Sequence, residues 1–178
     1  MDIYHLLKED HLEIQQILNE LISLRDDDEY RYILIEEIKN LLIPHSRAEE
    51  SVFYNTLRAI DTDTGIIMHG FREHLEAETL LRTLQLMERV NLNWKSTAKK
   101  LKQVLDHHID SEENEIFEEA KLAFSQDEAL SIGEAFEKLK NKIAEEGAVK
   151  NTMDILVNML PPRLTNGLRK FGEDHSSI

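Results

Sequence analysis

One segment occurs twice in this chain, each time with a histidine at its start and a glutamate four positions later. Residues 45–54 read HSRAEESVFY and residues 108–117 read HIDSEENEIF, so His45 precedes Glu49 as His108 precedes Glu112. Residues four apart on an α-helix lie on one face, about 6 Å from each other. A histidine and a glutamate at this spacing can bind one cation together, so the repeat predicts a metal site.

The sequence around both copies favours long helices. Only three prolines and six glycines interrupt the chain, and apolar residues recur at intervals of three and four. We expect four helices, over residues 2–24, 30–60, 66–87 and 93–124, with Asp2 and Asn93 as N-caps. Helices of this length with short connections predict an all-α fold, an up-down-up-down four-helix bundle.

Polar residues interrupt the apolar seam of every one of these helices. The interrupting residues are His11, His45, Glu49, His74, His108 and Glu112. In an antiparallel bundle they fall at similar heights, because each residue advances the helix by only about 1.5 Å. Two buried carboxylates would each cost several kcal/mol, or take up a proton, unless a cation compensates them. Two metal ions bridged by the glutamates fit six ligands, and the alternative is a set of core polar groups that hydrogen-bond one another.

The amino-acid composition limits which metal ions and which partners the chain can bind. The chain has no cysteine, which excludes protein thiolate ligands, and imidazole with carboxylate suits iron, manganese or zinc. The net charge of −14 opposes binding to nucleic acid or to an anionic membrane surface. The first residues do not read as a targeting signal and no apolar run reaches membrane-spanning length, so we expect a soluble, cytoplasmic protein.

These residues resemble the hemerythrin-like, or HHE cation-binding, family over about residues 1–124. Members hold a non-heme di-iron centre in a four-helix bundle, with one histidine from each of the first and third helices and a histidine and carboxylate pair from each of the second and fourth. The resemblance implies that the six residues listed above are the ligands, with Glu49 and Glu112 bridging two irons. It also implies dioxygen or nitric oxide as the small ligand.

One position departs from the family pattern. Oxygen-carrying hemerythrins have a second histidine on the third helix, and this sequence has Gly70 in its place. The resemblance therefore implies a vacant coordination position beside Gly70, which a small molecule or water could fill. Nearby residues could also complete the coordination or support it from outside: His69, Glu73, Glu78 and His107.

The sequence also predicts where several other polar and aromatic residues lie relative to the site. We expect Glu50 and Glu113 to be surface charges, and His5 and His175 not to be ligands. Tyr54 and Phe117 close the two copies and should pack about the site, where Tyr4 or Tyr54 could donate a hydrogen bond to a metal-bound ligand.

Residues 125–178 form the rest of the chain. Ser125 can cap a fifth helix ending near Glu146, and a short amphipathic segment with Met153 and Met159 stops at Pro161. We expect these helices to pack on the bundle, or to form a homodimer or partner surface.

Three functions agree with this sequence. The first is a di-iron protein that binds or senses dioxygen or nitric oxide. The second is a di-iron enzyme that acts on nitric oxide or peroxide, or donates iron for iron-sulfur cluster repair. The third is an iron-regulated interaction module that docks a partner on residues 125–178.

Overall fold

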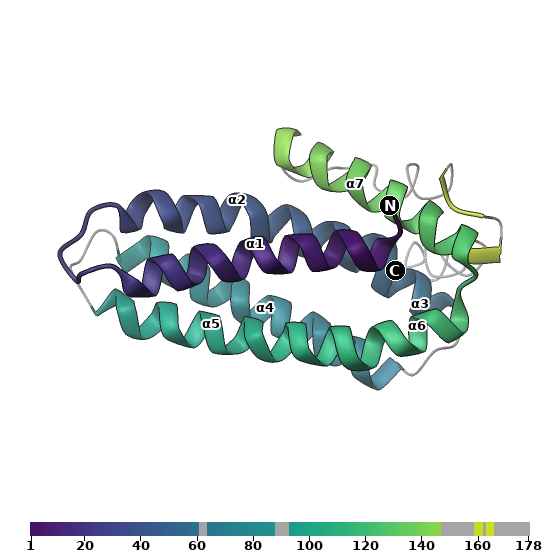
Figure 1. Ribbon diagram of the computed structural model, residues 1–178, viewed down its shortest axis with the longest axis horizontal. Helices are drawn as coiled ribbons and strands as arrows, with labels where there is room; N and C mark the ends of the chain where they lie inside the picture. Colours follow the sequence, from purple (N-terminus) through teal and green to yellow (C-terminus); the bar gives the residue numbers. More distant parts are fainter. Residues whose placement is uncertain (61–63, 88–92, 147–158, 162, 166–178) are drawn as a thin grey trace, which may run out of the picture.

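A computed structural model of the chain shows an antiparallel helical bundle with one further helix across it (Figure 1). The structure describes residues 1–60, 64–87, 93–146, 159–161 and 163–165. The predicted amphipathic segment around Met153 lies outside the described residues. None of the described helices is long and apolar enough to cross a membrane.

The four rods of the bundle follow one another in sequence. The first is α1 (Ile3–Ser23), and the third is α4 (Thr64–Met87). The second consists of α2 (Arg31–Glu49), η1 (Glu50–Tyr54) and α3 (Asn55–Ala59). The fourth consists of α5 (Trp94–Ser111), η2 (Glu112–Ile116) and α6 (Phe117–Ala123). Neighbouring rods pack α1 on α2, α2 on α4, α4 on α5 and α5 on α1, which confirms the predicted bundle.

Asp2 and Asn93, which the sequence predicted as N-caps, cap the starts of α1 and α5. The Asp2 side chain accepts a hydrogen bond from the His5 backbone N–H, and that of Asn93 accepts one from Ser96. Ser125 and Glu128 satisfy each other's backbone N–H groups in a capping box at the start of α7 (Gln126–Glu146).

Both copies of the repeat contain a π-helical turn, which the sequence analysis did not predict. The segments η1 and η2 begin at Glu50 and Glu112, next to or at the glutamate of each clamp. A π turn closes after five residues instead of four and is frequent at functional sites. On a regular helix Tyr54 would point about 140° away from Glu49. The wider turn brings the Tyr54 side chain back toward the face that carries Glu49.

The bundle interior has two separate hydrophobic clusters with a polar layer between them. One cluster, at the loop end far from α7, includes Ile14, Leu18, Leu42, Leu81 and Leu105. The other includes Ile3, Leu7, Val52, Phe53 and Phe117, together with residues of α7. The polar residues that interrupt the helical seams lie between these clusters, so apolar side chains close the site at both ends.

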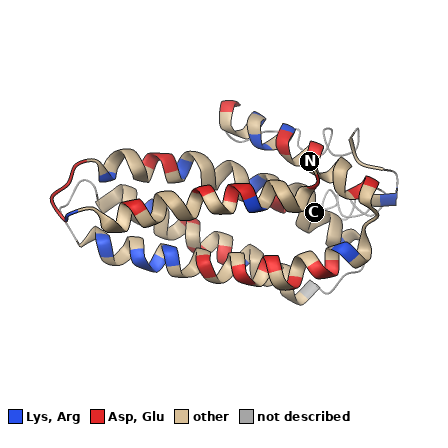
Figure 2. Cartoon of the chain, viewed as in Figure 1, with Lys and Arg blue, Asp and Glu red and all other residues tan. Residues whose placement is uncertain are grey.

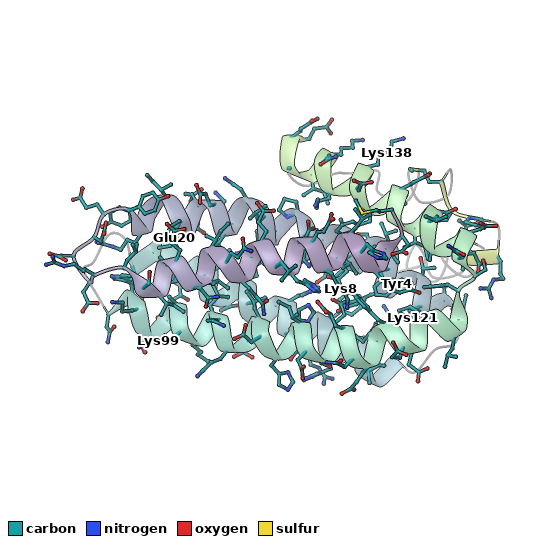
Figure 3. The ribbon with its side chains drawn as sticks, viewed as in Figure 1. Tyr4, Lys8, Glu20, Lys99, Lys121 and Lys138 are labelled. Atoms are coloured by element: carbon teal, nitrogen blue, oxygen red, sulfur yellow. The ribbon has the colours of Figure 1, made fainter. Side chains whose placement is uncertain are left out.

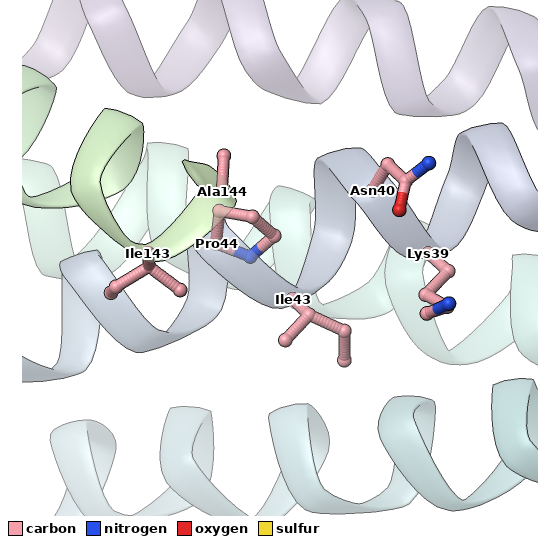
Figure 4. A pocket seen from close by; sticks show the side chains of 6 residues that line it. All are labelled: Lys39, Asn40, Ile43, Pro44, Ile143 and Ala144. Carbon is pink, nitrogen blue, oxygen red and sulfur yellow. The ribbon is translucent and has the colours of Figure 1, made fainter. Parts of the chain in front are cut away.

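Helix α7 packs across α1 and α2 (Figure 1). Its buried face includes Ile132, Phe136 and Leu139, all fully inaccessible to solvent. Gly133 allows the close approach, since a Cβ there would lie 2.5 Å from the Met1 carbonyl oxygen. Toward its end α7 leaves a pocket of about 250 Å³ against α2, lined by Ile43, Pro44, Ile143 and Ala144 among others (Figure 4).

Candidate metal centre

The six residues that interrupt the apolar seams come together in the polar layer, and all are buried. His11 Nε2 lies 3.2 Å from Glu112 Oε2, and His45 Nε2 lies 3.3 Å from Glu49 Oε2. The Nε2 atom of His74 is 3.4 Å from the same Glu49 oxygen and 3.1 Å from His108 Nε2. Four imidazoles therefore direct Nε2 toward the volume that the two carboxylates share.

Several atoms of this set have no hydrogen-bond partner. They include both carboxylate oxygens of Glu49, both of Glu112, and Nε2 of His11. Buried polar atoms without partners are rare, because each loses the hydration that it had in water. Two overlapping groups have ligand atoms within 4.8 Å of one another: His11, His108 and Glu112, and Glu49, His74 and His108. Nitrogen and oxygen donors at these separations fit a pair of transition-metal ions.

Burial and the close approach of charged groups shift the pKa values of four residues in the site in different directions. Burial and the nearby Glu49 charge raise the pKa of Glu112 well above its usual range. Burial also opposes ionisation of Glu49, but the neighbouring Glu112 carboxyl and the charge of His74 hold the pKa of Glu49 well below its usual range. Burial disfavours a charged His74 as well, yet the Glu49 carboxylate raises the pKa of His74 to about 10. Burial and the charge of His74 lower the pKa of His108 to about 4.

Each of the four histidines directs its other ring nitrogen, Nδ1, at a carboxylate outside the centre. A carboxylate at Nδ1 fixes the ring and favours the tautomer whose Nε2 can bind a metal. The Nδ1 to oxygen distances are 3.0 Å for His11 with Glu113, 3.0 Å for His45 with Asp10, 3.1 Å for His74 with Glu50, and 3.4 Å for His108 with Glu73.

Two of these carboxylates lie in places other than those that the sequence analysis predicted. Glu50 and Glu113 were expected at the surface, but both side chains are mostly buried and accept hydrogen bonds from histidines on other helices. The sequence does contain a signal for these carboxylates. Each outer carboxylate adjoins a residue of the centre in the chain, as Asp10 adjoins His11 and Glu73 adjoins His74.

Basic residues compensate the outer carboxylates from further out. Lys8 Nζ lies 3.1 Å from Glu113, and Lys8 projects from α1 toward the α5–α6 rod (Figure 3). Lys140 Nζ of α7 lies 2.7 Å from Asp10, which in turn holds His45. The ring of Phe136 also contacts that of His45, with centroids 5.9 Å apart. Helix α7 therefore contacts His45 directly through Phe136, and indirectly through Lys140 and Asp10.

The Tyr54 ring occupies the space beside Gly70. A Cβ at position 70 would lie only 2.6 Å from the Tyr54 hydroxyl oxygen, so a larger residue would collide with this ring. The Tyr54 ring stacks on His74, with centroids 5.6 Å apart, and its buried hydroxyl has no hydrogen-bond partner. Burial and the charges of Glu112 and Glu49 raise the pKa of Tyr54. The phenol thus holds its proton next to the two carboxylates.

From the sequence, four residues could complete or support the metal coordination: His69, Glu73, Glu78 and His107. Glu73 lies between His108 and the surface, and the exposed His69 and His107 contact its outer oxygen. Glu78 pairs with Arg47 and Arg82. Of the remaining histidines, His5 is exposed and bonds Asp2, and His175 lies outside the described residues.

Comparison with known proteins places this site in a family. Residues 2–120 match the family described as Hemerythrin HHE cation binding domain. The chain belongs to the hemerythrin HHE family. This HHE chain is also similar in fold to the crystal structure of a hemerythrin HHE cation binding domain-containing protein from Mycobacterium kansasii. That likeness has a TM-score of 0.67 at 24% identity and covers 90% of this chain and 99% of the other. No curated protein matches the sequence.

Proposed function

We propose that His11, His45, Glu49, His74, His108 and Glu112 hold two iron ions, with manganese or zinc as substitutes, and that the centre binds or senses dioxygen or nitric oxide. The observation that carries this proposal is the pair of fully buried carboxylates whose four oxygens have no hydrogen-bond partner, facing four imidazoles. Membership of a cation-binding family supports it. The bridging role of Glu49 and Glu112 is part of the proposal.

Non-heme iron held by imidazole and carboxylate supplies positions at which a small molecule such as dioxygen or nitric oxide can bind. The chain's own residues provide the surroundings. Hydrophobic clusters on both sides exclude water, and the carboxylates at Nδ1 orient the imidazoles. The protonated Tyr54 hydroxyl, next to Glu49 and Glu112, is placed to donate a hydrogen bond within the site.

Metal content and visible spectra test the proposal. Protein purified without added metal should contain close to two irons per chain. The reduced, iron-loaded protein should gain a charge-transfer band when exposed to air or nitric oxide. Glu112→Gln should reduce the iron content, whereas His5→Gln, at an exposed histidine, should not. Loss of iron without any new band would contradict the proposal.

A turnover enzyme acting on nitric oxide or peroxide, or a donor of iron for cluster repair, would use the same residues. Steady-state assays with nitric oxide and hydrogen peroxide separate these functions from reversible binding. Stoichiometric binding without turnover supports the binding protein, and sustained consumption supports the enzyme.

A second function is favoured by the contact between α7 and the centre. We propose that residues 1–124 form the metal-binding unit, and that residues 125–178 form an extension whose docking responds to iron through Lys140, Asp10 and His45. Limited proteolysis with and without iron tests this, because cleavage within α7 should slow when iron is bound. Equal cleavage rates would contradict it.

A further inference from the structure

Each histidine of the centre pairs through Nδ1 with an outer carboxylate, and we call each such pair a corner of the centre. The corner of His108 and Glu73 differs from the other three. At those corners the outer carboxylate is compensated by a lysine or an arginine: Lys8 beside Glu113, Lys140 beside Asp10 and Arg47 beside Glu50. In the part of the chain that the structure describes, the outward partners of Glu73 are imidazoles. A fixed positive charge is therefore present at three corners and replaced at the fourth by two metal-binding side chains.

The imidazoles at this corner converge on one oxygen from two helices. His69 Nε2 of α4 lies 3.3 Å from Glu73 Oε1, and His107 Nδ1 of α5 lies 2.6 Å from the same atom. The two rings are 5.7 Å apart between centroids. Two ligands of one ion lie about 3 Å apart when each metal–ligand bond is about 2.1 Å. One ligand atom from each of His69, Glu73 and His107 lies within 4.8 Å of the other two, close enough to surround one ion.

The pair on α4 also repeats the clamp of the buried centre. His69 precedes Glu73 by four residues, as His45 precedes Glu49 and His108 precedes Glu112. This third clamp faces outward, since the side chains of His69 and His107 are 49% and 67% exposed while that of Glu73 is 10% exposed. It opens into a pocket of about 270 Å³ whose lining includes Glu76, Lys100 and Gln103. The pocket leaves room for water to complete a coordination shell.

We infer that His69, Glu73 and His107 form a surface site for one divalent transition-metal ion, separate from the buried centre. Two imidazoles and one carboxylate with open positions suit ferrous iron or zinc. An ion there supplies the positive charge that a lysine or arginine supplies at the other three corners. It also lies one carboxylate from the centre, since Glu73 Oε2 is 3.4 Å from His108 Nδ1. The inference does not depend on the function of the buried centre.

Equilibrium dialysis of the full chain against zinc tests the surface site. The wild type should bind one zinc per chain more than the His69→Gln/His107→Gln double variant at the same free zinc concentration. Each single variant should weaken that additional zinc about tenfold or more. His5→Gln serves as the matched control and should bind like the wild type, since His5 is exposed and distant in sequence. Both changed histidines are solvent-exposed, so circular dichroism should show an unchanged fold.

Two results would overturn the inference. One is equal zinc stoichiometry and affinity in the wild type and the double variant. The other is the absence of any shift in the ring resonances of His69 and His107 when zinc is added to the labelled protein. Glu73→Gln is avoided because it also removes the partner of His108. The additional zinc is measurable whether or not the purified protein contains iron in its interior, so failure of one proposal is distinguishable from failure of the other.

Discussion

Glu113 connects a histidine of the centre to a surface lysine, and it shows how single residues outside the centre support it. Its Oε1 accepts a hydrogen bond from His11 Nδ1, and Lys8 approaches its other oxygen. Hydrogen bonding from His11, against the opposing effect of burial and with help from Lys8, holds the pKa of Glu113 below its usual value. The carboxylate is therefore ionised and orients the His11 ring.

Glu113→Gln should weaken metal binding without unfolding the bundle. Carboxylates that support metal-bound histidines change metal affinity about 10- to 100-fold when replaced. The measurement is the rate of iron release to a chelator. Glu115→Gln is the matched control, because Glu115 is exposed in the same π-helical turn. Similar release rates in the two variants would contradict the role of Glu113.

Tyr54→Phe tests the hydroxyl that fills the space beside Gly70. Removal of one hydrogen-bond donor costs about 1 kcal/mol, so the affinity for nitric oxide should fall about fivefold while the iron content stays unchanged. Titration of the reduced, iron-loaded protein measures this affinity. Tyr30→Phe is the control, because Tyr30 is exposed at the far end of the bundle. An unchanged dissociation constant would show that the hydroxyl has no part in ligand binding.

The ion pair of Glu128 and Arg163 gives a pH dependence with a definite sign. Hydrogen bonds from Arg163, against slight burial and with help from Ser125, lower the pKa of Glu128 to about 2. Because this pKa is lower in the folded state, the stabilisation is fully present above about pH 4.5 and is lost as the pH falls toward 2. The exposed pair contributes less than about 1 kcal/mol.

Urea unfolding of wild type and Glu128→Gln between pH 7 and 2 measures that contribution. The difference in unfolding free energy should be constant above about pH 4.5 and should approach zero near pH 2. The exposed Glu137→Gln variant, on the same helix, should show no such trend. A difference that grows on acidification would contradict the assignment.

At the scale of elements, the π-helical turn determines which side chains reach the centre. The seam pattern predicted the helices and brought six polar residues together, because three-and-four periodicity holds along regular helices. The pattern could not predict that Tyr54 lies beside Gly70, since it assumes four-residue turns and η1 has a wider one. Of the carboxylates at Nδ1, Glu73 was predicted as a supporting residue, but Asp10, Glu50 and Glu113 were not, because residues next to an inward position point sideways and there meet the neighbouring helix.

Deletion of Ser51 should convert this wide turn into a regular one. Residues before and after it would keep their packing, because a π turn contains one residue more than an α turn. Helix content by circular dichroism and iron content should both be retained, because Tyr54 then follows Glu49 by four residues and stays on the same face of a regular helix. Deletion of Asp27, in the exposed loop after α1, is the control. Loss of iron after the Ser51 deletion, but not after the Asp27 deletion, would contradict this geometry.

At the scale of the whole molecule, α7 belongs to the same hydrophobic core as the bundle. Phe136 and Leu139 are fully buried in one cluster with Ile3 and Phe53. The family match ends at residue 120, and the sequence left two alternatives for this helix, packing on the bundle or a partner surface, of which α7 shows the first. Charge is also distributed unevenly over the molecule, with lysines in the first half of α5 and acidic residues toward α6 (Figure 2).

Phe136→Ala should destabilise the protein by about 3–5 kcal/mol, the usual cost of removing a buried aromatic ring. It should also speed iron release, because the ring contacts His45. Urea unfolding and chelator assays measure the two effects, and Lys138→Ala, at an exposed position of α7, is the control. Unchanged stability would indicate that α7 is a separate unit.

The two copies of the repeat end differently, in Tyr54 and in Phe117. The centre is built from matching halves, yet only one half has a phenol. Two metal ions held as proposed would have unequal surroundings, because only one copy of the repeat ends in a hydroxyl. A diatomic molecule entering such a centre would encounter two different metal ions, and the Tyr54 hydroxyl would determine which of them it binds.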